Sequence, residues 1–192
     1  MTSPGRERRK QATRRALRSA VLELGLTHGL AEVTVEEIAA RAGVSPRTFF
    51  NYFATKEDAA LLDLFTIGDD ELDVFAAGPP EGAWTRLREL FAEDVGRVDR
   101  DGTDVPRWLA LQAGHPALQA CQFARFGAFE RRLCDAVTTR LGGPDHRLRA
   151  EVMAGACITA VRVGLQHRAG AGPGGLVVHV DAAFDLLDPA FA

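Results

Sequence analysis

Arg47, Thr48 and Asn51 have side chains that can recognise the edges of DNA bases. An arginine can donate two hydrogen bonds to a guanine, an asparagine can make two with an adenine, and a threonine methyl group can touch that of a thymine. If this segment is helical, the three side chains lie opposite Phe49 and Phe53 and face the solvent. They are therefore candidates for base recognition in a major groove.

Two short helices are predicted to position these side chains. Thr34 and Glu37 match a capping box at the start of the first helix, and Gly43 ends that helix. Ser45 is a suitable N-cap for the second helix, and Pro46 stands at its first position, where a backbone N–H is not needed. The freed N-terminus of the second helix carries partial positive charge, which suits a phosphate.

The segment 34–53 has the organisation of a helix-turn-helix. Ala39 and Ala42 are small enough for the two helices to cross closely, and Val44 fills the angle between them. In this motif the start of the second helix meets base edges in the major groove. Small three-helix units also occur in proteins that do not bind DNA, so the charge of the surrounding chain is a necessary second criterion.

The distribution of charge supports a polyanionic partner for the N-terminal part. The 192 residues carry a net charge of -3, but residues 1–56 hold 10 Lys and Arg against 5 Asp and Glu, a net of +5. The remaining residues hold 13 against 21, a net of -8. Seven of the basic residues fall within the first eighteen positions, where they suit backbone phosphates.

Apolar residues recur with helical spacing along nearly the whole chain, and no alternating strand pattern competes. The sequence therefore predicts an all-α fold with about nine helices, and Ala77–Gly82 is its clearest break. Besides the two helices of segment 34–53, we expect helices ending at Gly29, from Thr55 through Phe65, from Trp84 to about Asp101, after Pro106, and over about 116–141, 145–168 and 176–187.

The sequence IAARAGVSPRTFFNYFATKEDA closely resembles the signature of TetR-type bacterial transcription regulators. The resemblance implies an all-helical homodimer with a DNA-binding domain over residues 1–55, of which about 1–8 form a flexible arm, and a ligand-binding and dimerisation domain over residues 56–192. The DNA contacts implied by position are Thr34, Ser45, Arg47, Thr48, Tyr52 and Lys56, and the base-recognition and helix-terminus arguments add Asn51 and Pro46.

One position departs from that signature. The recognition helix has Phe50 where the family most often has tyrosine, and Phe50 lacks the hydroxyl that would reach a phosphate. Tyr52 keeps that capacity and is the only tyrosine of the chain. Lys56 opens the next helix, and the resemblance implies that it holds a phosphate.

The acidic remainder contains more aromatic residues than a spacer needs. Phe123, Phe126 and Phe129 recur every third position as one broad stripe, which aromatic residues from other elements could meet around a cavity. Ordinary core packing is the alternative interpretation. The candidate ligand-binding residues are Trp84, Leu87, Phe91, Trp108, Gln112, Phe123, Phe126 and Met153.

The helix predicted over 145–168 is apolar on nearly all sides. One side is therefore expected to pack against its own domain and the other against a second surface. A second copy of the chain is the simplest source of the second contact, and burial inside a monomer is the alternative. We therefore expect a homodimer formed by this helix and the last one. Its candidate interface residues are Val152, Gly155, Ala156, Thr159, Val163, Val180 and Phe184.

The C-terminal sequence further resembles a domain found in a subset of these regulators. The matching segments are HPALQACQFARFGAFERRL, RAEVMAGACITAVRVGLQHR and DAAFDLL. The subset includes the mycofactocin-system regulator, which is associated with long-chain acyl-CoA. The resemblance thus implies a small apolar ligand, and our hypothesis is a fatty acyl-CoA. Its candidate phosphate partners are Arg107, Arg125 and Arg162.

Other classes of function have little support. The five histidines show no metal-ligand spacing and no catalytic or nucleotide-binding motif follows a strand, so we expect neither an enzyme nor a cofactor or metal. Cys121, Cys134 and Cys157 cannot all pair and are expected to be buried thiols in a reducing cytoplasm. The sequence thus favours a repressor that a ligand releases from a palindromic double-stranded DNA operator. A DNA-binding protein without a ligand switch, either a constitutive repressor or an architectural factor, is the alternative.

Overall fold

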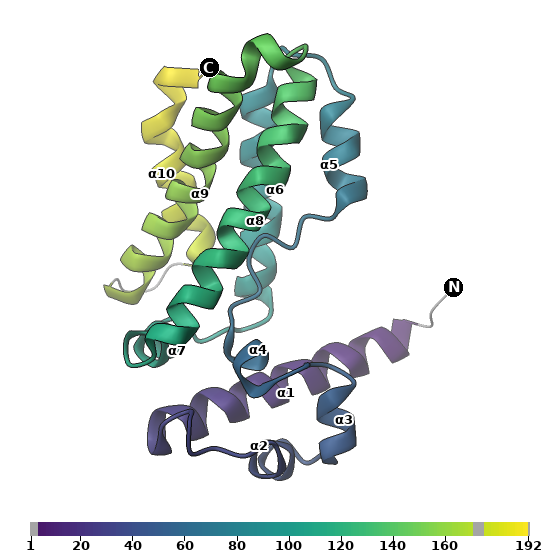
Figure 1. The fold of residues 1–192 in the computed structure, drawn as a ribbon, viewed down its shortest axis with the longest axis vertical. Helices are drawn as coiled ribbons and strands as arrows, with labels where there is room; N and C mark the ends of the chain where they lie inside the picture. Colours follow the sequence, from purple (N-terminus) through teal and green to yellow (C-terminus); the bar gives the residue numbers. More distant parts are fainter. Residues whose placement is uncertain (1–3, 171–174, 192) are drawn as a thin grey trace. The chain divides into compact units, whose positions relative to one another are not determined.

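The computed structural model describes residues 4–170 and 175–191, and every regular element in these ranges is helical. The predicted all-α fold is confirmed, with ten α-helices in the described residues where about nine were expected. In chain order (Figure 1) they are α1 (Pro4–His28), α2 (Val35–Arg41), α3 (Pro46–Phe50), α4 (Lys56–Ala60), α5 (Asp69–Ala76), α6 (Ala83–Arg100), α7 (Val105–Ala113), α8 (Pro116–Arg140), α9 (Arg147–Gly170) and α10 (Leu176–Phe191), with a 3₁₀ turn at Pro144–His146.

The described chain forms two compact units. The first unit combines the chain up to Leu62 with Pro106–Gln122. Its core is built on α1, which packs against α2 and α4, and α2 packs in turn against α3. Trp108 of α7 donates a hydrogen bond from its indole N–H to the Ala60 carbonyl at 2.9 Å, which ties α7 to the end of α4. The helix-turn-helix therefore belongs to a unit that also includes residues from the middle of the chain.

The second unit combines Asp63–Val105 with the chain from Phe123 onward. Within it α10 packs on both α9 and α6. Gly164 of α9 allows close approach, because a Cβ atom at this position would lie 2.5 Å from a methyl group of Val180 in α10. Phe91 and Phe184 are almost fully buried between these helices. This unit supplies the positions that the sequence suggests for ligand binding and dimerisation, apart from Trp108 and Gln112.

One predicted helix is wrong beyond Ala60. The fourth helix was expected to continue through Phe65, but Leu61 has extended backbone dihedrals (φ -77°, ψ 144°) and ends α4. The Phe65 amide instead donates to the carboxylate of Asp94 in α6 at 2.7 Å. Leu61, Leu64 and Phe65 are all buried, so their apolar spacing reflects burial on an irregular segment rather than a helical turn.

Most other helix boundaries follow the predicted signals closely. The long helix expected over 116–141 is observed as α8, and the one expected over 145–168 as α9. Thr55 caps α4 by accepting a hydrogen bond from the Asp58 amide at 3.0 Å, as the sequence suggested. None of the helices in the described residues is long and apolar enough to cross a membrane.

Candidate DNA-binding interface

The turn between α2 and α3 is fixed by local hydrogen bonds. Thr34 and Glu37 form the predicted capping box: the Glu37 amide donates to Thr34 Oγ1 at 3.2 Å, and the Thr34 amide donates to Glu37 Oε2 at 2.8 Å. The hydrogen bonds that the Thr34 amide and the Thr34 hydroxyl donate to Glu37 Oε2 lower the pKa of the Glu37 carboxyl group. At the other end, the Gly43 and Val44 amides donate to Ala40 and Ala39 carbonyls, and Gly43 has a φ of 71°. This arrangement is a Schellman motif, which requires the left-handed conformation that glycine adopts easily.

The start of α3 presents polar side chains to solvent while its other side is buried. Phe49 is fully buried, whereas Pro46, Arg47 and Asn51 are exposed. The Thr48 amide donates to Ser45 Oγ at 3.1 Å, and the hydroxyl groups of these two residues lie 2.9 Å apart. The capping bond orients the first turn of α3, so the exposed side chains project from a well-defined backbone.

Arg47 and Asn51 have no side-chain partner in the described part of the chain. Neither side chain makes a hydrogen bond or ion pair there, and both are exposed. The Arg47 guanidinium and the Asn51 amide are therefore available for a partner outside the chain. Their spacing of four residues places them on one face of the segment.

Lys56 and Tyr52 differ from these residues in their surroundings. Lys56 Nζ donates to the carbonyl oxygens of Ala31 and Val33, each at 2.8 Å, and so ties the start of α4 to the loop before α2. An ammonium group has three N–H donors, so one remains for a further acceptor. Tyr52 is half-buried.

Phe50 is an exposed aromatic residue on the same helix. Its side chain is 58% exposed, and its ring contacts that of Phe49 edge to face at 5.5 Å. The structure therefore places an apolar group, rather than a hydroxyl, where the signature has tyrosine.

The basic N-terminal residues extend as a helix. The predicted flexible arm over residues 1–8 lies partly outside the described residues, and α1 is already helical from Pro4. Exposed basic side chains project from its first turns, at Arg6, Arg8, Arg9, Lys10 and Arg15. Arg14 and Arg18 instead lie over the Phe53 ring at 4.9 and 5.5 Å, where they hold α1 to the end of the helix-turn-helix.

The structure does not bring all of the predicted ligand-binding residues together. Trp108 and Gln112 belong to the first unit, and the others belong to the second. Gln112 is buried, and its side-chain amide nitrogen has no hydrogen-bond partner. Phe123 is 60% exposed. Leu87, Phe91, Phe126 and Met153 are buried.

Phe91 and Phe126 do meet in one aromatic cluster. It also contains Phe129 and Phe65, and Phe65 was not among the predicted residues. Trp84 packs elsewhere, with its ring centroid 4.5 Å from that of Phe191 and 5.3 Å from that of Phe184. The ring centroid of Phe184 also lies 6.0 Å from that of Phe91, so Trp84 is linked to the aromatic cluster through Phe184 rather than by direct contact with the stripe.

Trp84 and Met153 line a hollow of about 620 Å³ at the start of α6. The other lining residues are Pro80, Glu81, Gly82, Ala83, Thr85, Leu141, His146, Arg149 and Phe191. A second hollow of about 430 Å³ is lined by residues of α6 and α10, and Trp84 is again one of them.

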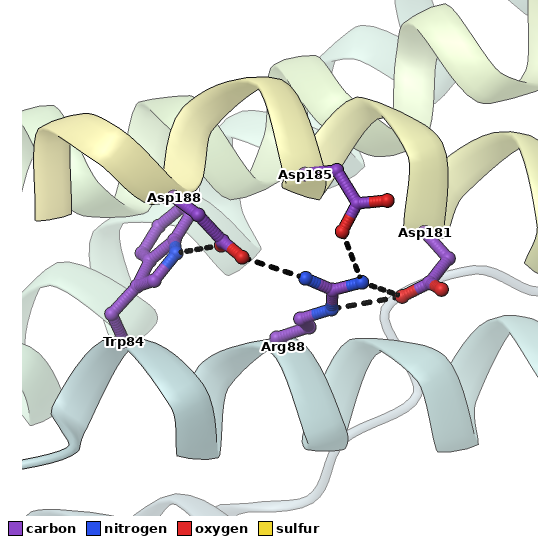
Figure 2. Close-up of polar contacts among 5 residues, drawn as sticks. All are labelled: Trp84, Arg88, Asp181, Asp185 and Asp188. Atoms are coloured by element: carbon purple, nitrogen blue, oxygen red, sulfur yellow. Dashed lines mark hydrogen bonds and ion pairs between the residues drawn. The ribbon is translucent and has the colours of Figure 1, made fainter. Parts of the chain in front are cut away.

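The second hollow is bordered by an ion-pair network that was not predicted from the sequence. Figure 2 shows Arg88 of α6 facing Asp181, Asp185 and Asp188 of α10. The guanidinium nitrogens lie 2.5 to 2.8 Å from the carboxylate oxygens of these residues. Asp188 also accepts a hydrogen bond from the Trp84 indole at 2.7 Å. The hydrogen bond to Asp181 is the main reason that the pKa of Arg88 is raised. The spacing of the three aspartates on one face of a helix was the available signal, but their partner lies more than ninety residues away.

The predicted dimer residues fall into two groups. Val152 and Thr159 of α9 are exposed, and Gly155, Ala156 and Val163 are partly so. Val180 and Phe184 are only 2% and 1% exposed, because they pack against the helices of their own unit. The exposed apolar residues of α10 are instead Val178 at 60% and Leu186 at 85%. The side chains of Val180 and Phe184 therefore have almost no surface left for a partner.

Two of the three predicted buried thiols are buried. Cys134 and Cys157 are enclosed, and burial raises the pKa of both thiols. Cys121 is exposed, contrary to the prediction, because it lies on the outer face of α8.

These elements define a helical protein with an N-terminal helix-turn-helix followed by a larger helical unit. Comparison with known families agrees: the family of bacterial regulatory proteins of the TetR type matches residues 17–60, and the MftR C-terminal domain family matches residues 81–192. The chain therefore belongs to the TetR family and carries a C-terminal domain of the MftR type. The family consists of transcriptional regulators rather than enzymes.

Two curated relatives fit this assignment. The HTH-type transcriptional regulator TcmR of Streptomyces glaucescens is 33% identical over 147 residues, which cover 72% of this chain and 65% of TcmR. The mycofactocin biosynthesis regulator MftR of Mycobacterium tuberculosis is 39% identical over 49 residues, which cover 26% of this chain and 25% of MftR. The chain thus matches slightly less than two thirds of the length of TcmR and a quarter of MftR.

Two solved structures align with nearly the whole chain. A TetR-family regulator from Mesorhizobium loti has 14% identity and a TM-score of 0.42, with coverage of 93% of this chain and 96% of its own. FadR of Thermus thermophilus, a TetR-family repressor solved in complex with lauroyl-CoA, has 22% identity and a TM-score of 0.32, with coverage of 93% and 95%.

Proposed function

We propose that this TetR-family protein is a sequence-specific repressor that binds a palindromic DNA operator as a homodimer and is released by a small apolar ligand. The DNA-binding part of the proposal is supported by the exposure of Arg47 and Asn51. Arg47 lies in the first turn of α3 and Asn51 at its end, and neither side chain has a hydrogen-bond or ion-pair partner in the described residues. A role on DNA would place the protein in the bacterial cytoplasm.

In this proposal the residues around α3 divide into two classes of contact. Arg47, Thr48 and Asn51 read base edges, while Thr34, Ser45, Tyr52 and the third N–H of Lys56 contact phosphates, and Pro46 leaves the helix start open to them. The exposed basic residues in the first turns of α1 add further phosphate contacts. Binding should therefore weaken steeply as the salt concentration rises.

Dimerisation is supported by the exposed apolar side chains of the last two helices. Val152 of α9 and Val178 and Leu186 of α10 leave more than half of their surface exposed. Gly155 and Ala156 are small enough to let another helix approach α9 closely. A two-fold arrangement would allow two copies of α3 to enter successive major grooves about 34–36 Å apart.

The ligand part of the proposal rests on the second unit. Its aromatic cluster and the hollow of about 620 Å³ offer apolar surfaces to a small molecule. A fatty acyl-CoA is the candidate suggested by the likeness to MftR-type domains. Arg125 and Arg162 of the second unit are its candidate phosphate partners, and Arg107 belongs to the first unit.

Dense packing of the aromatic cluster favours a second candidate function. Phe91 is fully buried and Phe126 is only 7% exposed, so two of the predicted ligand-binding residues are already covered by protein. A repressor or architectural protein without a ligand switch would have such a core. The two functions differ in whether any small molecule changes DNA affinity.

A binding-site selection with the purified full chain tests the proposal. The chain should enrich an inverted repeat from a library of random duplexes, and fluorescence anisotropy with the selected duplex should show that binding weakens with salt. A panel of fatty acyl-CoAs and uncharged apolar compounds is then added. Release by one class identifies the ligand chemistry, whereas unchanged affinity with every compound supports the second candidate. Enrichment of no sequence would overturn both.

A further inference from the structure

The space at the centre of the aromatic cluster is occupied by a residue that is not on a helix. The ring centroid of Phe65 lies 4.7 Å from that of Phe126, 5.0 Å from that of Phe129 and 5.8 Å from that of Phe91. The rings of Phe65 and Phe129 are nearly parallel, at 9°. Phe91 comes from α6 and the other two partners come from α8, so three helical aromatic residues surround one ring from the irregular segment 61–68.

Phe65 occupies this position with a strained backbone. Its φ is 58°, and it is the one non-glycine residue with positive φ in the described chain. The left-handed conformation is unfavourable for a bulky residue because the Cβ atom approaches the following carbonyl oxygen. Removal of the ring from the cluster would let the backbone relax, which offsets part of the cost of losing the ring contacts.

Asp94 of α6 holds the same segment from a second side. Its carboxylate is fully buried and accepts hydrogen bonds from the Phe65 amide at 2.7 Å, the Thr66 amide at 3.0 Å and the Thr66 hydroxyl at 2.7 Å. Arg97 pairs with the same carboxylate. Two anchors thus fix this segment, a ring in an aromatic cluster and a pair of amides on a buried carboxylate.

We propose that Phe65 is a displaceable occupant of the ligand site, and that the ligand is an uncharged planar aromatic group that takes its place. The inference rests on the ligand-released function proposed above. The walls are the rings of Phe91, Phe126 and Phe129, and the present occupant shows that a planar ring fits among them. The site is closed by the chain itself until a ligand enters.

The same displacement would act on the connection to the DNA-binding unit. The chain leaves the first unit at Leu62 and enters the second at Asp63, two residues before Phe65. When the ring leaves, the Phe65 and Thr66 amides are drawn from Asp94, and the segment that follows Leu62 loses both anchors. A ligand that enters the cluster would then release the connection to the DNA-binding unit in the same step.

The first test uses Phe65→Ala in the full chain with indole as the probe. The substitution should create an aromatic-lined cavity, so indole should bind about tenfold more tightly than to the wild type, as measured by calorimetry. Hydrogen exchange should become about tenfold faster in residues 63–68. Phe75→Ala is the matched control, because Phe75 is a buried phenylalanine of the same unit outside the cluster. Equal indole affinity and equal exchange in the two variants would overturn the proposal.

A second variant keeps the test decisive if Phe65→Ala does not fold. Asp94→Asn keeps the ring but replaces one carboxylate oxygen with an NH2 donor that faces one of the two amides, which then loses its acceptor. Hydrogen exchange at residues 65 and 66 should become faster, and indole should bind more tightly. Glu93→Gln is its control, since Glu93 is an exposed carboxylate on the same helix. Unchanged hydrogen exchange in Asp94→Asn would show that Asp94 does not hold the Phe65 and Thr66 amides, and it would overturn the proposal.

DNA affinity completes the experiment. Phe65→Ala should bind the selected duplex about tenfold more weakly than Phe75→Ala, and Asp94→Asn about tenfold more weakly than Glu93→Gln. Faster exchange with unchanged DNA affinity would overturn the coupling. If the wild-type chain selects no duplex, the proposed function fails instead, and the indole and exchange results still decide whether Phe65 closes a ligand site.

Discussion

At the scale of single residues, Lys56 combines a structural role with a proposed DNA contact. Its ammonium group donates to the carbonyl oxygens of Ala31 and Val33. We predict that Lys56→Met lowers the free energy of unfolding by about 1–2 kcal/mol, because two charge-assisted hydrogen bonds are lost at a partly exposed site. Urea denaturation without DNA measures this, and Arg47→Ala is the control that should leave stability unchanged. Equal stability of the two variants would contradict the structural role of Lys56.

The cysteines give a second prediction at this scale. Burial raises the pKa of the Cys134 and Cys157 thiols, so they remain protonated at neutral pH, while Cys121 is exposed. Iodoacetamide should therefore modify Cys121 in the native protein within minutes and the other two only after denaturation. Mass spectrometry of the peptides identifies the modified residue. Rapid modification of Cys157 in the native state would show that α9 is less buried than the structure indicates.

At the scale of elements, Arg88 links α6 to α10 through three aspartates. Asp185 is 62% exposed on its side chain, whereas Arg88 is only 24% exposed. We predict that Asp185→Asn changes the free energy of unfolding by less than about 0.5 kcal/mol, since an exposed ion pair contributes little. Arg88→Met should cost about 1–3 kcal/mol, because it leaves three aspartates without their common partner. Thermal denaturation of the two variants measures the difference, and equal effects would contradict the central position of Arg88 in Figure 2.

The helices with local signals could be predicted from the sequence. Thr34, Ser45 and Thr55 each accept a hydrogen bond from an amide three residues later, so the information needed to place α2, α3 and α4 lies within a few positions. The same holds for the family signature, which is carried by one continuous segment. The sequence therefore indicated where the exposed residues of α3 would lie.

The segment 61–68 could not be predicted in this way. Its amides pair with side chains far along the chain, such as Leu62 with Gln122 and Phe65 with Asp94. Apolar spacing alone cannot separate such a segment from a helix, since both bury residues three and four apart. For the same reason the sequence indicated that Phe91 and Phe126 would meet but not that Phe65 would lie between them.

At the scale of the whole molecule, the exposed side chains of α9 and α10 predict self-association. Leu186→Asp places a charge on a residue that is 85% exposed in the single chain, so it should weaken the proposed dimer about tenfold or more. Val74→Asp on α5 is the matched control, because Val74 is 73% exposed but lies outside these helices. Sedimentation should show a wild-type dimer that Leu186→Asp dissociates and Val74→Asp does not. A monomeric wild type would contradict the proposed assembly.

Base recognition by α3 is the central claim, and the sequence preference of Arg47→Ala tests it most directly. The variant and the wild type are each used to select duplexes from the same random library, with Arg149→Ala as a control in an exposed arginine of the second unit. We predict that Arg47→Ala loses about 1–3 kcal/mol of discrimination at one base pair of each half-site, while Arg149→Ala keeps the full preference. Selection of the same sequence with the same strength by wild type and Arg47→Ala would contradict the claim.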